Sequence, residues 1–244
     1  MKMRVTAEVA ARSPKPSRVG STPTTRANKK RNNMKNKEIN LRGKLMELKS
    51  SVPLGKSGDY IIEEFTVTED EASFFNMRQM VKGQGRNITV GTYKRLYRGK
   101  SNWGTVVMSD TPAEKRDHIH FIQKAEGNVL INGLGLGWVI EALFEKQEVR
   151  HVTVIEISKD VIKLTGNYLK DKYDNKLTII NEDALEYKLK KNEKYDFVWH
   201  DIWDDICADN WETMTQLHKK YAKRCKFQDS WVRDRVKYLR KIDY

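Results

Sequence analysis

The chain has 244 residues, a formal net charge of +13 and 39% hydrophobic residues. That length allows one ordinary domain with a small extension, and it excludes a large multidomain assembly. No apolar run approaches the ~20 residues that span a bilayer, so we expect no membrane partner. The two cysteines, Cys207 and Cys225, cannot form a disulfide framework, which indicates a reducing, cytoplasmic compartment.

The basic charge lies at the two ends of the chain. Residues 1–58 carry 15 Lys and Arg against 3 acids, and residues 212–244 carry 10 against 4. Residues 1–33 contain three prolines and no aromatic side chain, so we predict that residues 1–58 form a largely disordered extension, with a helix near 38–50. The extension has three interpretations: an organelle transit segment, an arm that binds nucleic acid, or a mis-started leader before Met34, which we favour.

A small α/β element is predicted next, over residues 59–111. Its expected parts are a strand at 60–70, a helix at 69–81 and a β-hairpin with strands at 88–98 and 105–109. Thr111, Pro112 and Glu114 then form a capping box that predicts a helix over 112–124. His118 and His120 stand two apart, on different helix faces, so we expect surface histidines and no metal site.

Strand and helix then alternate four times. A short apolar run at 129–131 leads into Gly133-Leu134-Gly135-Leu136-Gly137, followed by a helix over 138–146. Further strands are predicted at 151–156, 177–181 and 195–200, with a short helical stretch before the last. This order predicts a doubly wound, Rossmann-like parallel sheet in a domain over 112–244.

The residues at the strand ends suit a nucleoside. Glycines after the first strand let a ligand approach the backbone near a helix N-terminus. Glu156 ends the second strand, where a carboxylate can accept two ribose hydroxyls, and Asp183 follows the third. Ligands of such sheets bind at the carboxyl ends of the strands, so these side chains should meet.

The glycine run is G-x-G-x-G, because residue 138 is Trp where a dinucleotide fingerprint has its third glycine. No Gly-Lys-Ser/Thr follows, which excludes a P-loop. The pattern resembles the class I S-adenosylmethionine (SAM)-dependent methyltransferase superfamily. The resemblance implies SAM as the cofactor and these residues as its site: Gly133, Gly135, Gly137, Glu156, Ile157, Asp183 and Ala184.

Two further stretches resemble the spermidine synthases, which are aminopropyltransferases that use decarboxylated SAM. One is residues 108–114, before the glycine run. The other is Asp201-Ile202-Trp203-Asp204-Asp205, similar to that family's Asp-x-x-Asp-Pro motif except that Asp205 replaces Pro. The resemblance implies that Asp201 and Asp204 hold an amine substrate, with Asp110 nearby. A solvated acidic loop is the alternative interpretation.

Other side chains near the fourth strand extend the candidate site. His200 could act as a base near neutral pH, and Trp203 could stack on a substrate. Nucleic-acid amino-methyltransferases have prolines after this strand, and residues 200–205 have none, which disfavours that class. Cys207 lacks a Pro-Cys motif, so we expect no nucleophile there.

The C-terminal part predicts helices at 210–224 and 231–242 and shows no β-rich run, which leaves open whether the sheet is truncated after its fourth strand. Three functions compete. The first is a SAM-dependent methyltransferase for an unidentified nucleophilic substrate. The second is a spermidine-synthase-like aminopropyltransferase, and the third is a non-catalytic module that binds SAM or, through its basic ends, nucleic acid. A dimer stays open.

Overall fold

The computed structural model describes residues 23–81, 85–99 and 104–242. The chain divides into two compact units, Met1–Ile39 and Asn40–Tyr244, and helix α1 (Pro23–Glu47) contains the boundary between them. Within the described residues, no helix is long and apolar enough to cross a membrane. Of residues 1–33, interpreted above as a transit segment, an arm or a leader, residues 1–22 lie outside the described residues.

Helix α1 begins earlier than the sequence predicts. Pro23 is its first residue, where the missing N–H costs nothing because that donor has no partner inside a helix. The second unit also begins before residue 58, the expected end of the disordered extension: Leu45 and Val52 are completely buried. Residues 40–57 are therefore part of the second folded unit.

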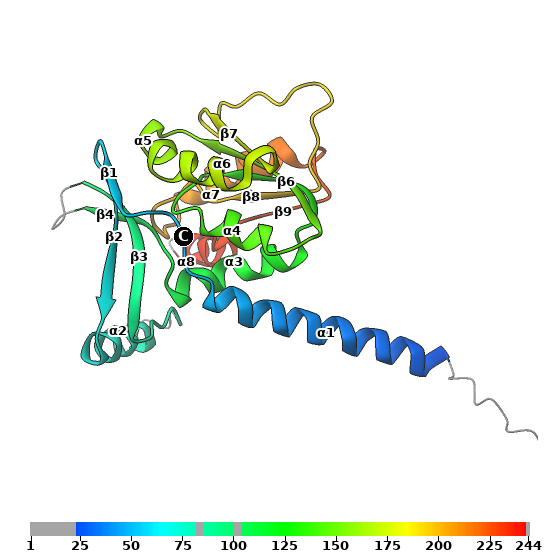
Figure 1. Ribbon diagram of the computed structural model, residues 1–244, viewed down its shortest axis with the longest axis horizontal. Coiled ribbons are helices and arrows are strands. Elements are labelled where there is room, and N and C mark those ends of the chain that lie inside the picture. The colour runs from blue at the N-terminus through cyan, green and yellow to red at the C-terminus, as the bar shows by residue number, and fades with distance from the viewer. Residues whose placement is uncertain (1–22, 82–84, 100–103, 243–244) are drawn as a thin grey trace, which may run out of the picture. The chain divides into compact units, whose positions relative to one another are not determined.

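The N-terminal strands form their own antiparallel sheet. Its order is β1 (Gly55–Ser57), β2 (Tyr60–Val67), β3 (Gly91–Arg98) and β4 (Thr105–Ser109), with α2 (Glu69–Val81) between β2 and β3. Ile62, Leu96 and Met108 lie opposite one another across β2, β3 and β4, and all three are buried. This sheet is separate from the parallel sheet (Figure 1).

The second sheet is parallel and has five strands in the order β7-β6-β5-β8-β9. Their bounds are Gly127–Asn132 for β5, Val149–Glu156 for β6, Leu177–Asn181 for β7, Phe197–His200 for β8 and Phe227–Ser230 for β9. The doubly wound fold is thus confirmed, but the suggested truncation after the fourth strand is wrong. Strand β9 has the sequence Phe-Gln-Asp-Ser, which carries no apolar pattern, and pairing with β8 is what orders it.

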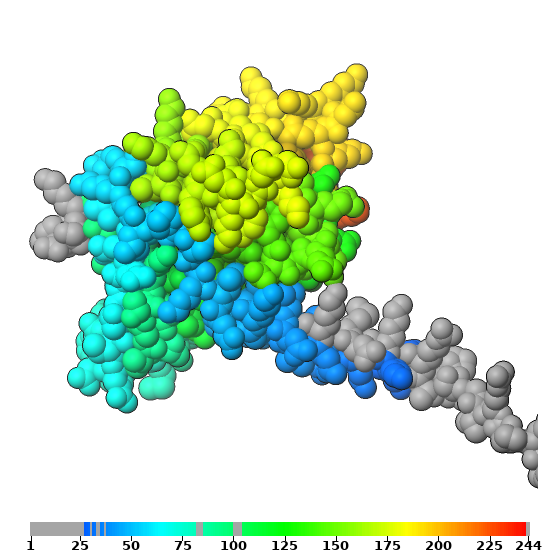
Figure 2. Space-filling model, viewed as in Figure 1, coloured from blue at the N-terminus to red at the C-terminus, as the bar shows by residue number. Residues whose placement is uncertain are grey.

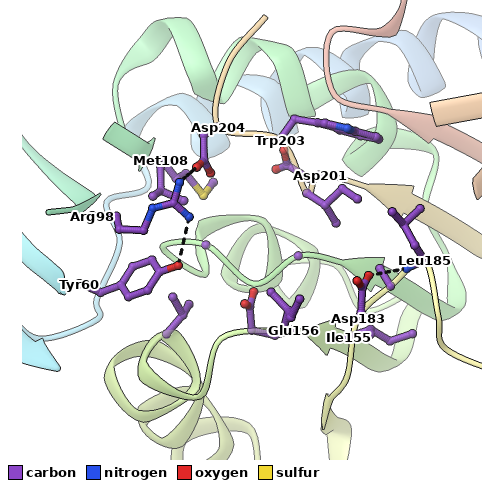
Figure 3. A pocket seen from close by; sticks show the side chains of 17 residues that line it. Tyr60, Arg98, Met108, Ile155, Glu156, Asp183, Leu185, Asp201, Trp203 and Asp204 are labelled. Carbon is purple, nitrogen blue, oxygen red and sulfur yellow. Dashed lines mark hydrogen bonds and ion pairs between the residues drawn. The ribbon is translucent and has the colours of Figure 1, made fainter. Parts of the chain in front are cut away.

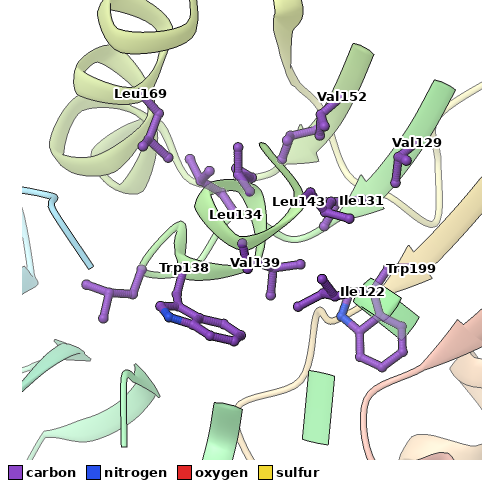
Figure 4. Packing of buried hydrophobic residues seen from close by; sticks show 14 of the residues in the cluster. Ile122, Val129, Ile131, Leu134, Trp138, Val139, Leu143, Val152, Leu169 and Trp199 are labelled. Atoms are coloured by element: carbon purple, nitrogen blue, oxygen red, sulfur yellow. The ribbon is translucent and has the colours of Figure 1, made fainter. Parts of the chain in front are cut away.

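Helices cover both faces of this sheet, as the alternation along β5 shows. Val129 and Ile131 pack into the large cluster that includes Trp138 and Trp199 (Figure 4). Leu130, between them on the strand, packs into a second cluster. The remaining helical elements are α3 (Pro112–Lys124), α4 (Trp138–Phe144), α5 (Lys159–Val161), the π-helix η1 (Ile162–Gly166), α6 (Asn167–Tyr173), the 3₁₀ helix η2 (Asp174–Lys176), α7 (Asn210–Tyr221) and α8 (Arg233–Ile242).

Three local expectations are wrong. The segment between β7 and β8 forms turns and no helix, and it lies at the surface (Figure 2). The capping box does not form, because Glu114 accepts from the backbone N–H of Ser109 and the Thr111 hydroxyl pairs with the Ser109 hydroxyl at 3.0 Å. His118 is buried against Trp138 and Trp199 and is no surface residue.

Candidate cofactor-binding site

A pocket lies at the carboxyl ends of β5, β6, β7 and β8. From β5 the chain first builds the sheet outward through β6 and β7, and then returns to the other side of β5 with β8. Such a reversal of strand order opens a crevice above the sheet. The pocket is lined by Tyr60, Arg98, Val107, Met108, Gly133, Gly135, Ile155, Glu156, Ile157, Val161, Asp183, Ala184, Leu185, Asp201, Ile202, Trp203 and Asp204 (Figure 3).

The glycine loop is shaped for close backbone approach. Gly133 has φ +98°, and a Cβ there would lie 2.0 Å from the carbonyl oxygen of Asp201. Gly135 has φ +51°, and its Cβ would lie 2.7 Å from the sulfur of Met108. Gly137, also predicted to bind cofactor, does not line the pocket. A Cβ on Gly137 would meet Leu169 at 2.5 Å, so its lack of a side chain serves helix packing.

Glu156 is held at the end of β6 by the backbone. Its Oε2 accepts from the N–H of Leu134 at 2.8 Å, and its Oε1 accepts from the N–H of Ser158 at 2.7 Å. Burial raises the pKa of this carboxyl, while those backbone N–H groups counteract the rise. A carboxylate has about four lone-pair sites, so acceptor capacity remains for a ligand's hydroxyl groups.

Asp183, Ala184 and Leu185 form one end of the pocket. Asp183 accepts from the backbone N–H of Leu185 at 2.8 Å, which fixes its side chain beside the cavity. Ile157 lines the pocket after Glu156 and is largely exposed. Four predicted cofactor contacts besides the two glycines, namely Glu156, Ile157, Asp183 and Ala184, are therefore brought together around one cavity.

Asp201 stands where β8 ends. Burial, together with the nearby carboxylates of Glu114 and Asp117, raises its pKa to about 8. The Nε2 atom of His118 lies 3.9 Å from the Asp201 carboxylate. Burial lowers the pKa of His118 to about 3, so this imidazole is neutral near pH 7 and does not neutralise the acid by charge.

Asp204, the second acid of the motif, is paired. Its Oδ2 accepts from Nη2 of Arg98 at 2.6 Å, and Nη1 of Arg98 lies 3.5 Å from the Tyr60 hydroxyl. Trp203 also lines the pocket, but its indole N–H donates to the Thr213 hydroxyl at 2.9 Å, which anchors the ring.

Two predicted site residues lie elsewhere. His200 is fully buried below the pocket, with its ring nitrogens 2.7 Å from the Asn132 amide and 3.1 Å from the Gln228 amide oxygen. Burial lowers its pKa to about 3, so it is not placed to act as the predicted base. Asp110 is buried too, and it accepts from the backbone N–H groups of Ser50 and Lys94, which joins two segments of the N-terminal region.

Sequence reasoning missed the pocket wall that the antiparallel sheet supplies. Tyr60 and Arg98 face each other across β2 and β3, and Val107 and Met108 come from β4. The register that pairs Tyr60 with Arg98 carries no short-range sequence signal. In the sequence, only the resemblance of residues 108–114 to spermidine synthases pointed to this part of the chain.

Comparison with known proteins finds one family model that matches most of the parallel domain. Residues 114–231 match the model of the spermine/spermidine synthase domain. This confirms the resemblance to the spermidine-synthase-like branch of the class I SAM-dependent methyltransferase superfamily. A search of curated proteins gives no match.

Solved structures with related folds include methyl and aminopropyl transferases. Spermidine synthase from Thermotoga maritima is 18% identical, with 72% of this chain and 54% of that chain covered and a TM-score of 0.40. A spermidine synthase in complex with the transition-state analogue AdoDATO is 19% identical, with 63% and 46% covered and a TM-score of 0.36. A dimethyladenosine transferase from Plasmodium falciparum is 19% identical, with 43% and 34% covered and a TM-score of 0.33. The matches span about a third to a half of those proteins' own lengths.

Proposed function

We propose that the chain is a SAM-dependent methyltransferase that acts on a nucleophilic substrate. One observation carries the proposal: Gly133, Glu156, Asp183 and Asp201, from the ends of four neighbouring parallel strands, line a single pocket. The match to the spermine/spermidine synthase domain supports SAM or decarboxylated SAM as the cofactor.

The residues of the pocket fit such a cofactor. Gly133 and Gly135 line the pocket without a side chain, Glu156 keeps free acceptor positions, and Asp183 offers an acceptor at the far end. Glu156 lies between Asp183 on one side and Arg98 on the other (Figure 3). We infer that the ribose contacts Glu156 and that the adenine lies toward Asp183 and Leu185.

When bound, SAM supplies an electrophilic methyl group on a sulfonium. The chain contributes mainly by positioning, because holding two reactants in line lowers the activation barrier of the transfer substantially. Asp201 is the group that takes the substrate's proton onto a carboxylate oxygen. Its pKa of about 8 means that the base form increases as the pH rises through that value.

Aminopropyl transfer from decarboxylated SAM is the second candidate function. The spermine/spermidine synthase match and the position of Asp201 and Asp204 at the pocket favour it. A third candidate, a nucleic-acid-binding module, is favoured by α1, whose residues 23–47 carry eight Lys and Arg against two acids. Salt-dependent RNA or DNA binding that disappears on deletion of residues 1–39 would support this third function.

Calorimetric titration of the full chain tests the main proposal. We expect SAM and S-adenosylhomocysteine to bind at micromolar to sub-millimolar concentration. Decarboxylated SAM as the only ligand would favour the aminopropyltransferase. Failure of all three to bind at millimolar concentration would reject both enzyme functions.

A further inference from the structure

The pocket holds one ion pair, between Arg98 and Asp204, at the end away from Asp183. Arg98 is the one basic side chain among the described residues that line the cavity, which otherwise carries the acids Glu156, Asp183, Asp201 and Asp204. Arg98 ends β3, and Asp204 lies in the loop after β8, so folding brings them together from 106 positions apart.

The pair leaves donors and acceptors free. Asp204 and Tyr60 take two of the five guanidinium N–H groups of Arg98, and the side chain of Arg98 is 49% exposed. Asp204 is 27% exposed, and one carboxylate oxygen has no contact with Arg98. A cation and an anion therefore stand side by side at the pocket surface.

An amino-acid zwitterion is the chemical group that matches such a pair. Its carboxylate complements the guanidinium fork of Arg98, and its ammonium complements the carboxylate of Asp204. SAM carries this zwitterion at its methionine end, whereas decarboxylated SAM carries only the ammonium. If the adenine lies toward Asp183 and the ribose at Glu156, the other end of the cofactor points toward Met108 and Arg98 (Figure 3).

On this basis, and resting on the proposed function, we propose that Arg98 is a specificity-determining residue that binds the α-carboxylate of SAM and thereby selects SAM over decarboxylated SAM. The inference thus narrows the reaction to transfer from SAM itself.

The test compares three ligands that share a nucleoside and differ at the far end: SAM, decarboxylated SAM and 5′-methylthioadenosine, which lacks the amino-acid part. Their dissociation constants are measured by calorimetry on the full chain and on Arg98→Gln. Arg95→Gln is the matched control, because Arg95 lies on the same strand, pairs with Glu63 at 2.5 Å and does not line the pocket.

We expect Arg98→Gln to raise the dissociation constant of SAM about 10- to 100-fold, as for the loss of a charge-assisted hydrogen bond. Binding of 5′-methylthioadenosine should stay within twofold, and Arg95→Gln should leave all three constants unchanged. Asp204→Asn should not weaken 5′-methylthioadenosine either.

Two outcomes overturn the proposal in different ways. If the nucleoside binds but Arg98→Gln weakens SAM no more than decarboxylated SAM, Arg98 does not select the carboxylate, and the proposed function stands. If none of the three ligands binds to the wild-type chain, the proposed function itself fails and this inference fails with it.

Discussion

The two ends of the pocket are built in different ways. At the nucleoside end, Glu156 and Asp183 are held by backbone N–H groups, most of them within two positions along the chain. At the other end, Arg98 and Tyr60 come from the antiparallel sheet and Asp204 from the loop after β8, and Arg98 contacts the other two by its side chain. The nucleoside end is therefore encoded locally, and the end where the substrate would react depends on how two sheets dock.

The largest expected effect on stability comes from substitution of Gly133, in the loop that lines the pocket. Gly133→Ala places a Cβ 2.0 Å from the backbone oxygen of Asp201 at φ +98°. We expect the free energy of unfolding to fall by about 3 kcal/mol, from backbone strain and overpacking together. Denaturant unfolding measures it.

Gly43→Ala is the matched control, because Gly43 lies in α1 with no atom within 4 Å of its would-be Cβ. The same substitution there should stabilise the chain slightly, by up to about 1 kcal/mol. Equal effects of the two substitutions would show that the Gly133 loop has room the structure does not indicate.

At the nucleoside end, Glu156→Ala should weaken binding of S-adenosylhomocysteine at least about 100-fold, because two charge-assisted hydrogen bonds to the ribose are lost. Calorimetry measures the dissociation constant, and a thermal melt confirms folding. Glu182→Ala, at an exposed neighbouring acid, is the control and should leave the constant unchanged. If Glu156→Ala binds S-adenosylhomocysteine within threefold of wild type, Glu156 does not bind the ribose.

At the reacting end, the charge of Asp201 should govern affinity for the sulfonium. The pKa of Asp201 is raised to about 8, so its carboxylate forms as the pH rises from 7 to 9. We expect SAM to bind several-fold to about tenfold more tightly over that range, whereas S-adenosylhomocysteine, which has a neutral sulfur, should not change with Asp201. Asp201→Asn should abolish the difference between the two ligands. A ratio of SAM to S-adenosylhomocysteine affinity that is constant from pH 6 to 9.5 in the wild type would refute this account of Asp201.

The last effect concerns His200 and is confined to acid pH. Burial lowers its folded pKa from 6.5 to about 3, so neutral His200 contributes stability that is present above pH 6.5 and is lost as the pH falls toward 3. His200→Asn should remove this contribution. Relative to the variant, the wild type should lose up to about 1.4 kcal/mol per pH unit over that range. His118 and the carboxyls of Glu114 and Asp201 titrate in both proteins and cancel in the comparison. Parallel curves of unfolding free energy against pH would show that His200 does not titrate as described.

The contrast between the two ends also explains what the sequence could predict. Gly133, Glu156 and Asp183 could be placed because each follows a strand with a strong apolar run, and parallel strands end at one edge of the sheet. The same reasoning located Asp201 after β8. It misplaced His200, because adjacent residues at a strand end point to opposite faces, and only one of the two reaches the pocket.

Features that depend on long-range pairing could not be predicted. Strand β9 has no apolar pattern and forms by pairing with β8, and Arg98 reaches the pocket only through the register of β2 against β3. Leu45 and Val52 fold into the core although their surroundings are basic and rich in turn-forming residues. In each of these cases the decisive contact is made by a residue far along the chain.

The most direct test of the central claim is a crystal structure of the chain with S-adenosylhomocysteine. We expect the ribose hydroxyls within hydrogen-bond distance of Glu156, the adenine beside Asp183 and Leu185, and the α-carboxylate at Arg98. Ligand density away from the carboxyl ends of β5, β6 and β7, or a ribose that does not contact Glu156, would contradict it.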